Sequence, residues 1–247
     1  MLHFHVVTLF PESIEPYLKT SIIGRAIATK KIKISYYDPK KFTRDPIRNA
    51  SRSNGAGKYG RVSEDRVDRR PYGGGPGMVL RPEPFLRAVK KAIGNKKVEI
   101  IFFATDGAQF DEKMAKKLAG YTSLTSVHKS DLFRQTKHIV FICGHYEGID
   151  ARVQKILKAK KVSVGPYVLT GGELPAATVI DAVARFVPGV LGKAESLEAS
   201  RVSSPEVYTR PEILVWKGKK YRVPKVLLSG NHAKMIEWKN KRRGLAK

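Results

Sequence analysis

The sequence predicts an α/β domain built around a mainly parallel sheet, and three observations support this prediction. Short apolar runs of strand length alternate with segments of helical periodicity through residues 1–187. The runs are apolar at consecutive positions, as expected for parallel strands that helices cover on both faces. Glycine-rich turns follow several runs, at the strand ends where open α/β sheets bind their ligands.

The predicted elements alternate in order along the chain. The opening strand runs to Phe10 and is stopped by Pro11. Further strands are predicted at 32–37, 98–103, 138–143 and 162–164, where the apolar runs are short. Helices are predicted at 24–31, 82–93, 111–118 and 174–186. The second of these helices begins with a proline and the third has acidic residues in its first turn, and both features favour a helix start.

Two segments interrupt this alternation and divide the chain. Residues 40–77 form a long basic stretch with few apolar side chains, which is typical of a functional or disordered loop. Residues 188–204 are rich in Ser and Glu and are interpreted as an interdomain linker. We therefore predict a main domain at 1–187, the linker at 188–204, and a small basic domain at 205–247.

The charge of the chain points to a polyanionic partner. Lys and Arg number 47 against 22 Asp and Glu, a formal net charge of +25. A compact chain tolerates this self-repulsion most readily when it binds nucleic acid, although a lysine-rich proteome would give the same composition. No apolar stretch approaches the roughly 18 residues of a membrane span, and the first ten residues lack the features of a signal peptide. We expect a cytoplasmic protein with no membrane partner.

The single cysteine and the histidines carry no predicted metal or redox site. Cys143 excludes an intrachain disulfide and lies in an apolar run, so it is interpreted as a buried strand residue. The six histidines show no spacing typical of metal ligands. His3 and His5 alternate on one face of the first strand and are interpreted as structural.

Three glycine-rich turns are the candidate functional segments: Pro71–Met78, Cys143–Asp150 and Val164–Pro175. The first holds four glycines in five positions, which is more than one tight turn requires. The second could bind a ligand through the aromatic face of Tyr146 and the carboxylate of Glu147. It can also be interpreted as a structural strand-to-helix turn with Asp150 as N-cap. None matches a Walker A loop or a dinucleotide fingerprint, so a nucleotide-phosphate site of those kinds is not expected.

These three turns resemble the tRNA (guanine-N1)-methyltransferases of the SPOUT superfamily. Four more segments resemble the family in content and order: Thr8–Glu12, Ile180–Gly192, Tyr208–Glu212 and Val226–His232. The resemblance implies an α/β domain with a parallel sheet tied in a deep trefoil knot. It also implies a small helical C-terminal domain and an obligate homodimer.

The resemblance further implies that S-adenosylmethionine binds bent in the knot. The expected cofactor-binding residues are Gly144, Tyr146, Val164, Gly165, Pro166, Tyr167, Val168, Leu169, Gly171 and Gly172. Glu147 matches a family glutamate that works near the target base and supports a magnesium (Mg²⁺) dependence. Arg185 matches a family arginine that acts across the dimer interface.

The implied substrate is guanine 37 of tRNA, beside the anticodon, with no role for DNA. The residues expected to bind the anticodon stem-loop are Tyr72, Gly73, Gly74, Gly75, Lys239, Arg242 and Arg243. In the implied reaction N1 of guanine attacks the sulfonium methyl group while a carboxylate removes the N1 proton. Arg185 would stabilise the charge that develops on O6.

The sequence departs from the family pattern at several positions. His145 stands where the family usually has arginine, and Pro166 where it usually has aspartate. Segments 47–62 and 121–135 look like insertions. The position of the family's catalytic aspartate falls on Ser200, so we assign the general base to Glu198, with Glu195 as the alternative.

Two competing readings remain open at this point. A SPOUT enzyme could methylate a ribose 2′-hydroxyl instead, although the segments Tyr72–Met78 and Tyr208–Glu212 are specific to the guanine enzymes. The chain could also be an RNA-binding protein without catalysis, which Ser200 alone supports.

Overall fold

The computed structural model describes residues 1–43, 66–121, 137–191 and 206–244. The chain divides into two compact units, Met1–Val190 and Leu191–Lys247. The predicted insertions at 47–62 and 121–135 lie almost entirely outside the described residues, as does nearly all of the predicted linker. In the described parts, no helix is long and apolar enough to cross a membrane.

A five-stranded sheet forms the centre of the first unit. Its order is β2 (Ile32–Tyr37), β1 (Leu2–Val7), β6 (Lys137–Ile142), β5 (Val98–Gln109) and β7 (Lys160–Ser163). Every neighbouring pair is parallel. The predicted α/β class with a parallel sheet is therefore confirmed, while the trefoil knot stays a prediction.

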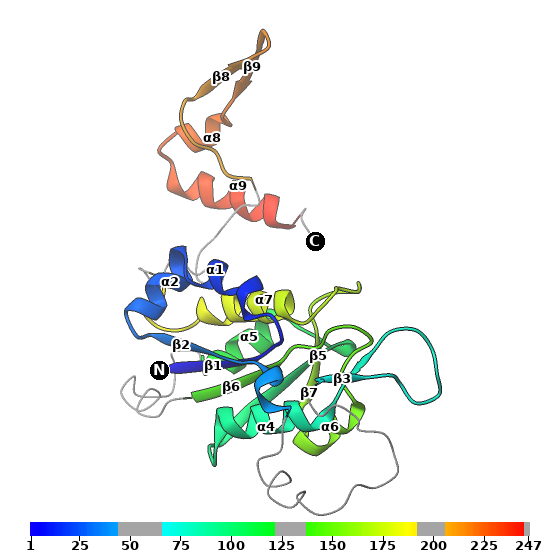
Figure 1. Cartoon of the computed structure of the whole chain (residues 1–247). Helices are drawn as coiled ribbons and strands as arrows, with labels where there is room; N and C mark the ends of the chain where they lie inside the picture. Colours follow the sequence, from blue (N-terminus) through cyan, green and yellow to red (C-terminus); the bar gives the residue numbers. More distant parts are fainter. Residues whose placement is uncertain (44–65, 122–136, 192–205, 245–247) are drawn as a thin grey trace, which may run out of the picture. The chain divides into compact units, whose positions relative to one another are not determined.

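Helices cover both faces of this sheet (Figure 1). One face is covered by α4 (Pro82–Ile93) and α6 (Ala151–Leu157). The other is covered by α1 (Glu15–Leu18), α2 (Ser21–Ala28), α5 (Glu112–Ala119) and α7 (Glu173–Ala184). All six residues of β1 are buried, because alternate side chains of a central strand enter the two cores in turn. Phe4 and Val6 belong to the core under α7, and Val7 to the core under α4.

The predicted bounds differ from the observed ones where local signals are weak. The helix predicted at 24–31 begins at Ser21, and the strand predicted at 98–103 continues to Gln109 through a register shift against β7 between Phe103 and Ala108. The sequence analysis did not predict α6. The N-cap of α6 is Asp150, whose side chain accepts a hydrogen bond from the Arg152 amide. The turn at Cys143–Asp150 therefore leads from a strand into a helix, in agreement with the interpretation of Asp150 as an N-cap.

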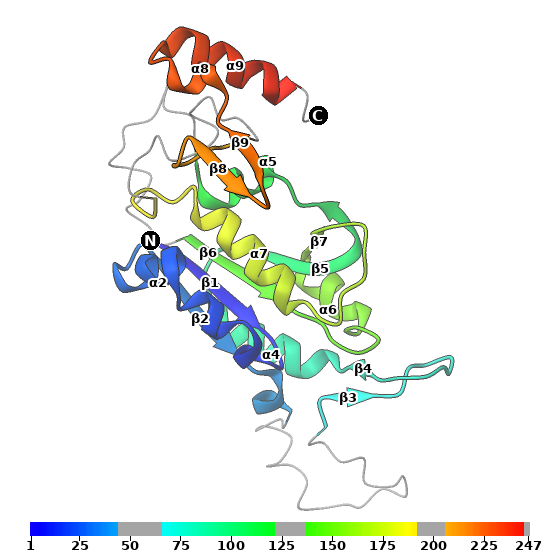
Figure 2. The ribbon, with the colours of Figure 1, turned by 90° about the horizontal axis from the view of Figure 1, so that it is seen from above.

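A short antiparallel ribbon carries the first glycine-rich turn. Strands β3 (Asp68–Arg69) and β4 (Val79–Leu80) pair and leave residues 70–78 as the connecting loop. Figure 2 shows this loop extending away from the sheet beyond α4. The remaining short elements are the 3-10 turns η1 (Pro11–Ser13) and η2 (Pro39–Phe42).

The second unit contains a hairpin as well as helices. Strands β8 (Ile213–Trp216) and β9 (Lys219–Arg222) form an antiparallel pair, followed by α8 (Lys225–Leu228) and α9 (His232–Gly244). The small C-terminal domain was expected to be helical; α8 and α9 lie there, together with a hairpin that was not predicted. Lys217 and Gly218 both have positive φ in the two-residue turn, a combination that favours tight hairpins.

Candidate active site

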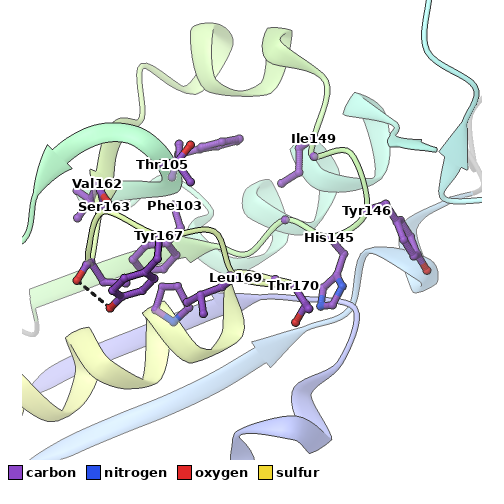
Figure 3. A pocket seen from close by; sticks show the side chains of 18 of the residues that line it. Phe103, Thr105, His145, Tyr146, Ile149, Val162, Ser163, Tyr167, Leu169 and Thr170 are labelled. Atoms are coloured by element: carbon purple, nitrogen blue, oxygen red, sulfur yellow. Dashed lines mark hydrogen bonds between the residues drawn. The ribbon is translucent and has the colours of Figure 1, made fainter. Parts of the chain in front are cut away.

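The carboxyl ends of β5, β6 and β7 meet around a cavity of about 370 Å³ (Figure 3). This position is where open α/β sheets bind ligands, and the volume lies in the usual range for small-molecule sites. The cavity is lined by Phe102, Phe103, Ala104, Thr105, Gly144, His145, Tyr146, Glu147, Gly148, Ile149, Val162, Ser163, Val164, Gly165, Tyr167, Leu169, Thr170, Gly171, Gly172 and Pro175. Most of these residues come from the second and third glycine-rich turns.

The loops after β6 and β7 are held together by backbone hydrogen bonds. The Gly172 amide donates to the Gly144 carbonyl at 2.9 Å, and His145 forms an isolated antiparallel bridge with Gly171. A Cβ atom on Gly172 would lie 2.6 Å from Cys143 Cα, closer than side chains tolerate. Glycine is therefore required at 172 because the two backbones pack against each other.

A buried carboxylate orients the loop after β6. Glu173, at the start of α7, is 4% exposed and accepts hydrogen bonds from Thr8 Oγ1 at 2.5 Å and from His145 Nε2 at 2.9 Å. The Phe10 ring packs edge-on against His145. Histidine therefore fills the position of the family's arginine and supplies a partner for this carboxylate. The preceding Cys143 is fully buried, and burial raises the pKa of its thiol well above the ordinary value, as a structural role requires.

Tyr167 covers part of the cavity. Its ring lies against the Cα of Gly165, where a Cβ atom would overlap the aromatic carbons, and its hydroxyl donates to the Val164 carbonyl at 3.2 Å. Ser163 Oγ donates to the Gly165 carbonyl at 2.9 Å and stabilises the turn below the ring. The third turn thus places backbone polar groups and one aromatic ring at the cavity.

Glu147 lies where this cavity adjoins a second one. The second cavity, of about 1050 Å³, lies between the β3–β4 ribbon and the start of α6 and is also lined by Glu147 and Ile149. The Glu147 amide donates to the Met78 carbonyl at 3.1 Å, and its side chain packs against Gly77, which leaves no room for a Cβ atom there. Gly77 also has φ +79°, so both conformation and contact require glycine.

The second cavity is rich in arginine. Arg66, Arg69, Arg70, Arg81 and Arg152 line it, together with Asp68, Asp150 and Tyr72. Arg152 hydrogen bonds to Asp150 at 2.6 Å and holds the pKa of that carboxyl below its ordinary value. The Tyr72 side chain is fully exposed in the loop that connects β3 and β4. Arginines beside an exposed aromatic ring are suited to RNA, since they can bind phosphates while the ring stacks on a base.

The structure brings most of the predicted cofactor residues to one place. Eight of them line the first cavity: Gly144, Tyr146, Val164, Gly165, Tyr167, Leu169, Gly171 and Gly172. Pro166 and Val168 belong to the same loop but not to the cavity wall, and Val168 is 83% exposed. Phe102–Thr105 were not predicted as site residues; their only signal was their place at the end of the apolar run at 98–103. The contact of Thr8 with Glu173 was not predicted either.

Of the other predicted site residues, Glu147 also lines this cavity, and none of the remaining described ones belongs to its wall. Arg185 follows the last turn of α7, about 18 Å along the helix axis from Glu173. Gly73, Gly74 and Gly75 lie in the loop of the ribbon. Lys239 and Arg242 lie on α9 of the second unit, where Arg242 bonds to Glu206 at 2.8 Å and stacks over Trp238. Glu198, Glu195 and the side chain of Arg243 lie outside the described residues.

Comparisons with known proteins cover nearly the whole chain. Residues 2–246 match the family described as tRNA (Guanine-1)-methyltransferase TrmD. A relative from Magnetococcus marinus named tRNA (guanine-N(1)-)-methyltransferase is 36% identical over 244 residues, which are 97% of this chain and 84% of the relative. Relatives of the same name from Pseudoalteromonas atlantica and Brevibacillus brevis are 37% and 38% identical, over 96% and 97% of this chain and 78% and 86% of the relatives.

Proposed function

The chain belongs to the tRNA (guanine-1)-methyltransferase family, and on that premise we propose that it methylates N1 of guanine 37 in tRNA. S-adenosylmethionine is the proposed methyl donor, and the anticodon stem-loop is the substrate. The reaction would take place in the cytoplasm. The observation that carries this proposal is Glu147, which lines both the glycine-rich cavity and the arginine-rich one.

The first cavity has the features that the donor requires. Its wall includes Gly144, Gly165, Gly171 and Gly172, whose backbone groups can hydrogen bond an adenine edge without adding side-chain bulk. S-adenosylmethionine supplies an electrophilic sulfonium methyl group when bound. Gly172 brings the loops after β6 and β7 into contact, and the Glu173–His145 pair holds the wall in place.

The second cavity has the features that the RNA substrate requires. Its arginines can neutralise phosphates, and Tyr72 offers a ring for a base that leaves the stack. Glu147 faces both cavities and would lie near the transferred methyl group. We include a Mg²⁺ ion in the proposal, because this cation binds through one or two carboxylates plus substrate oxygens and water, and Glu147 offers such a carboxylate.

Catalysis needs a group that accepts the N1 proton, since N1 of guanine is protonated at neutral pH. We propose Glu198 for this role, with Glu195 as the alternative, because a serine at 200 is too weak a base. Arg185 would stabilise the charge that develops on O6. Arg185 lies about 18 Å along the axis of α7 from Glu173. This distance favours a role of Arg185 in the active site of a second copy of the chain, and hence a homodimer.

The direct test is incubation of the full chain with unmodified tRNA and methyl-labelled S-adenosylmethionine, followed by nucleoside analysis. We expect label in N1-methylguanosine, and none when guanine 37 is replaced by adenine. Label in a 2′-O-methylated nucleoside would support the ribose reaction instead. Binding of tRNA without any methyl transfer would support the RNA-binding reading.

The homodimer is tested by complementation between two variants. Arg185→Ala and Glu147→Gln should each be inactive alone. Co-expressed with different tags and purified as a mixed dimer, they should regain activity, because one site then has both residues intact. If the mixed dimer stays as inactive as its parents, Arg185 does not act across an interface.

A further inference from the structure

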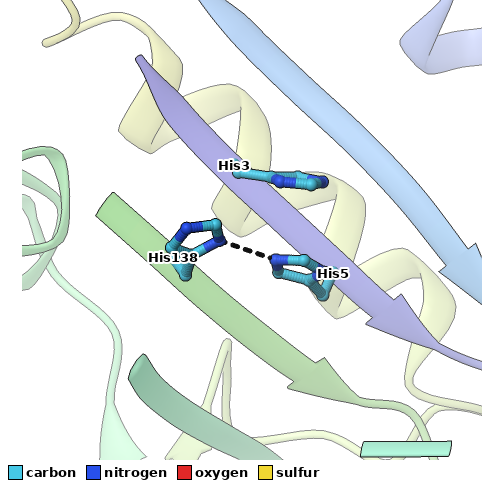
Figure 4. Close-up of side chains that lie close together, drawn as sticks. All are labelled: His3, His5 and His138. Carbon is cyan, nitrogen blue, oxygen red and sulfur yellow. Dashed lines mark hydrogen bonds between the residues drawn. The ribbon is translucent and has the colours of Figure 1, made fainter. Parts of the chain in front are cut away.

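Three histidines gather at the amino-terminal ends of β1 and β6, far from the proposed active site. His3 and His5 lie on β1 and His138 lies on β6 (Figure 4). Each offers one ligand nitrogen, and these three nitrogens lie within 4.8 Å of one another. His5 is 1% exposed, His3 is 8% exposed and His138 is half-buried.

The parallel register creates this cluster. His3 pairs with His138 across the ladder, and His5 is two residues further along β1, so all three side chains project from the same face of the sheet. That face is the one covered by α4, where Val7 and Val140 belong to the core. The cluster therefore lies at the edge of a core that would otherwise take apolar side chains, and the burial of imidazoles there requires partners.

Two hydroxyl groups of β2 hold the outer nitrogens of the cluster. His3 Nε2 lies 2.9 Å from Ser35 Oγ, and His5 Nδ1 lies 3.2 Å from Tyr37 Oη. Each of these rings therefore keeps its second nitrogen for the interior of the cluster. An outer hydrogen bond of this kind fixes ring orientation and tautomer in metal-binding histidines.

Two of the three ligand nitrogens are spaced for a shared cation, and that of His3 lies within 4.8 Å of both. His5 Nε2 and His138 Nδ1 lie 2.9 Å apart, so one proton must lie between them. In a tetrahedral zinc site, bonds of about 2.0–2.1 Å separate neighbouring nitrogens by roughly 3.3 Å. A metal ion can replace the shared proton after a shift of a few tenths of an ångström between these two rings.

The chemistry of the three groups favours a borderline metal over a hard one. His3 and His5 are buried and His138 is half-buried, and a buried imidazole without an acidic partner stays neutral near pH 7 and can act as a ligand. Three imidazole nitrogens suit Zn²⁺ and not Mg²⁺ or Ca²⁺, which prefer oxygen. Exposed Lys33 and Lys96 lie near enough to act on these groups, and their charge should make binding weaker than in a site with acidic neighbours.

We propose that His3, His5 and His138 form a binding site for one Zn²⁺ ion that links β1 and β6. Binding moves the proton shared by His5 and His138 to the other nitrogen of the ring that carries it, so no net proton is released, and the half-buried side of His138 gives water access to a fourth position. The six-residue strand β6 places this site about 20 Å from Gly144 at the other end of the sheet. Its role is therefore stability of the sheet, separate from methyl transfer.

The test is a titration of the full-length protein with ZnCl₂ by calorimetry, with bound zinc counted after dialysis. We expect one ion per chain and a higher Tm in the presence of zinc. His138→Gln should abolish this binding, and Ser35→Ala should weaken it by about 10–100-fold. His232→Gln is the matched control, because His232 is an exposed histidine of the second unit.

Two results would overturn the proposal. One is the absence of saturable zinc binding by the wild type, and the other is unchanged binding by His138→Gln. His5→Gln is a supporting variant. Because His5 is buried, the folding of this variant must first be checked by circular dichroism. If His5→Gln fails to fold, the result for His138→Gln decides the outcome, since His138 is half-buried. Methylation by His138→Gln should equal that of the wild type, so the zinc site and the proposed function can fail independently.

Discussion

The first unit packs two cores around its sheet, whereas none of the described residues 206–242 of the second unit is buried. In the second unit Trp216 and Tyr221 are both more than half exposed, among lysines at 217, 219 and 220. Its described side-chain contacts are surface ones, such as those of Arg242 with Glu206 and Trp238. The first unit can therefore hold cavities of fixed shape, while the second offers mainly charge and aromatic rings.

This difference suggests a division of labour. Changes in the first unit should alter donor binding, chemistry or stability, because its loops are fixed by close backbone contacts such as that of Gly172 with Cys143. Changes in the second unit should alter tRNA affinity and its salt dependence, because phosphates are bound through charge. The predictions below test this division, from the largest expected effect to the smallest.

The strongest challenge to the division is catalysis by Glu198, which belongs to the predicted linker at 188–204 and to neither domain. We expect Glu198→Gln to lower single-turnover methylation by about 10²–10⁴-fold, as removal of a general base does, with partial recovery at high pH. Glu195→Gln is the matched control and should have much less effect. A near-normal rate for Glu198→Gln would assign proton removal to Glu195, Glu147 or water.

A second test concerns the contact between the loops of the first cavity. Gly172→Ala should destabilise the fold by about 1–3 kcal/mol and weaken donor binding, because its Cβ atom would meet the Cys143 backbone. Gly144→Ala is the control for fold stability alone, since its Cβ atom would lie at an ordinary 3.4 Å from Ile149. Thermal unfolding compares the two variants, and donor calorimetry compares Gly172→Ala with the wild type; equal stability of the two variants would show that the loop contact contributes little.

A third test concerns the buried carboxylate beside the cavity. His145→Ala should cost about 1–3 kcal/mol, because Glu173 then keeps only its bond from Thr8 in a buried position. His145→Arg should recover much of this loss, since arginine is the residue usual in the family at this position. Chemical denaturation measures both variants. Equal destabilisation by alanine and arginine would show that the pair with Glu173 contributes little.

The smallest effect is expected from single charges of α9. Lys241→Gln should reduce the slope of log affinity for tRNA against log salt concentration by about 0.7–0.9 if it binds one phosphate. Arg242→Gln should change the slope less, because Glu206 and Trp238 already engage Arg242. Donor affinity should stay constant in both. A slope that neither variant changes would mean that this end of α9 does not bind RNA.

The sequence by itself determined the fold class, the order of most elements and the two glycine-rich turns that meet at the cavity. It could do so because strand length, apolar runs and glycine content are local properties of the chain, as in 138–143 followed by Gly144. The hairpin β8–β9 and helix α6 were not predicted. Helix α6 is short and Val153 is its one buried residue. None of the hairpin residues is buried, so the apolar run of β8 shows no core-facing pattern.

Only the tertiary structure decided which distant residues meet. Thr8 and Glu173 are 165 residues apart, and His5 and His138 are 133 apart, yet both pairs form hydrogen bonds because β1 is an interior strand between β2 and β6. The spacing of histidines along the chain could not predict their cluster, which depends on the register of β1 against β6. Strand pairing is set by the packing of the whole domain, so contacts of this kind follow from tertiary structure and not from local pattern.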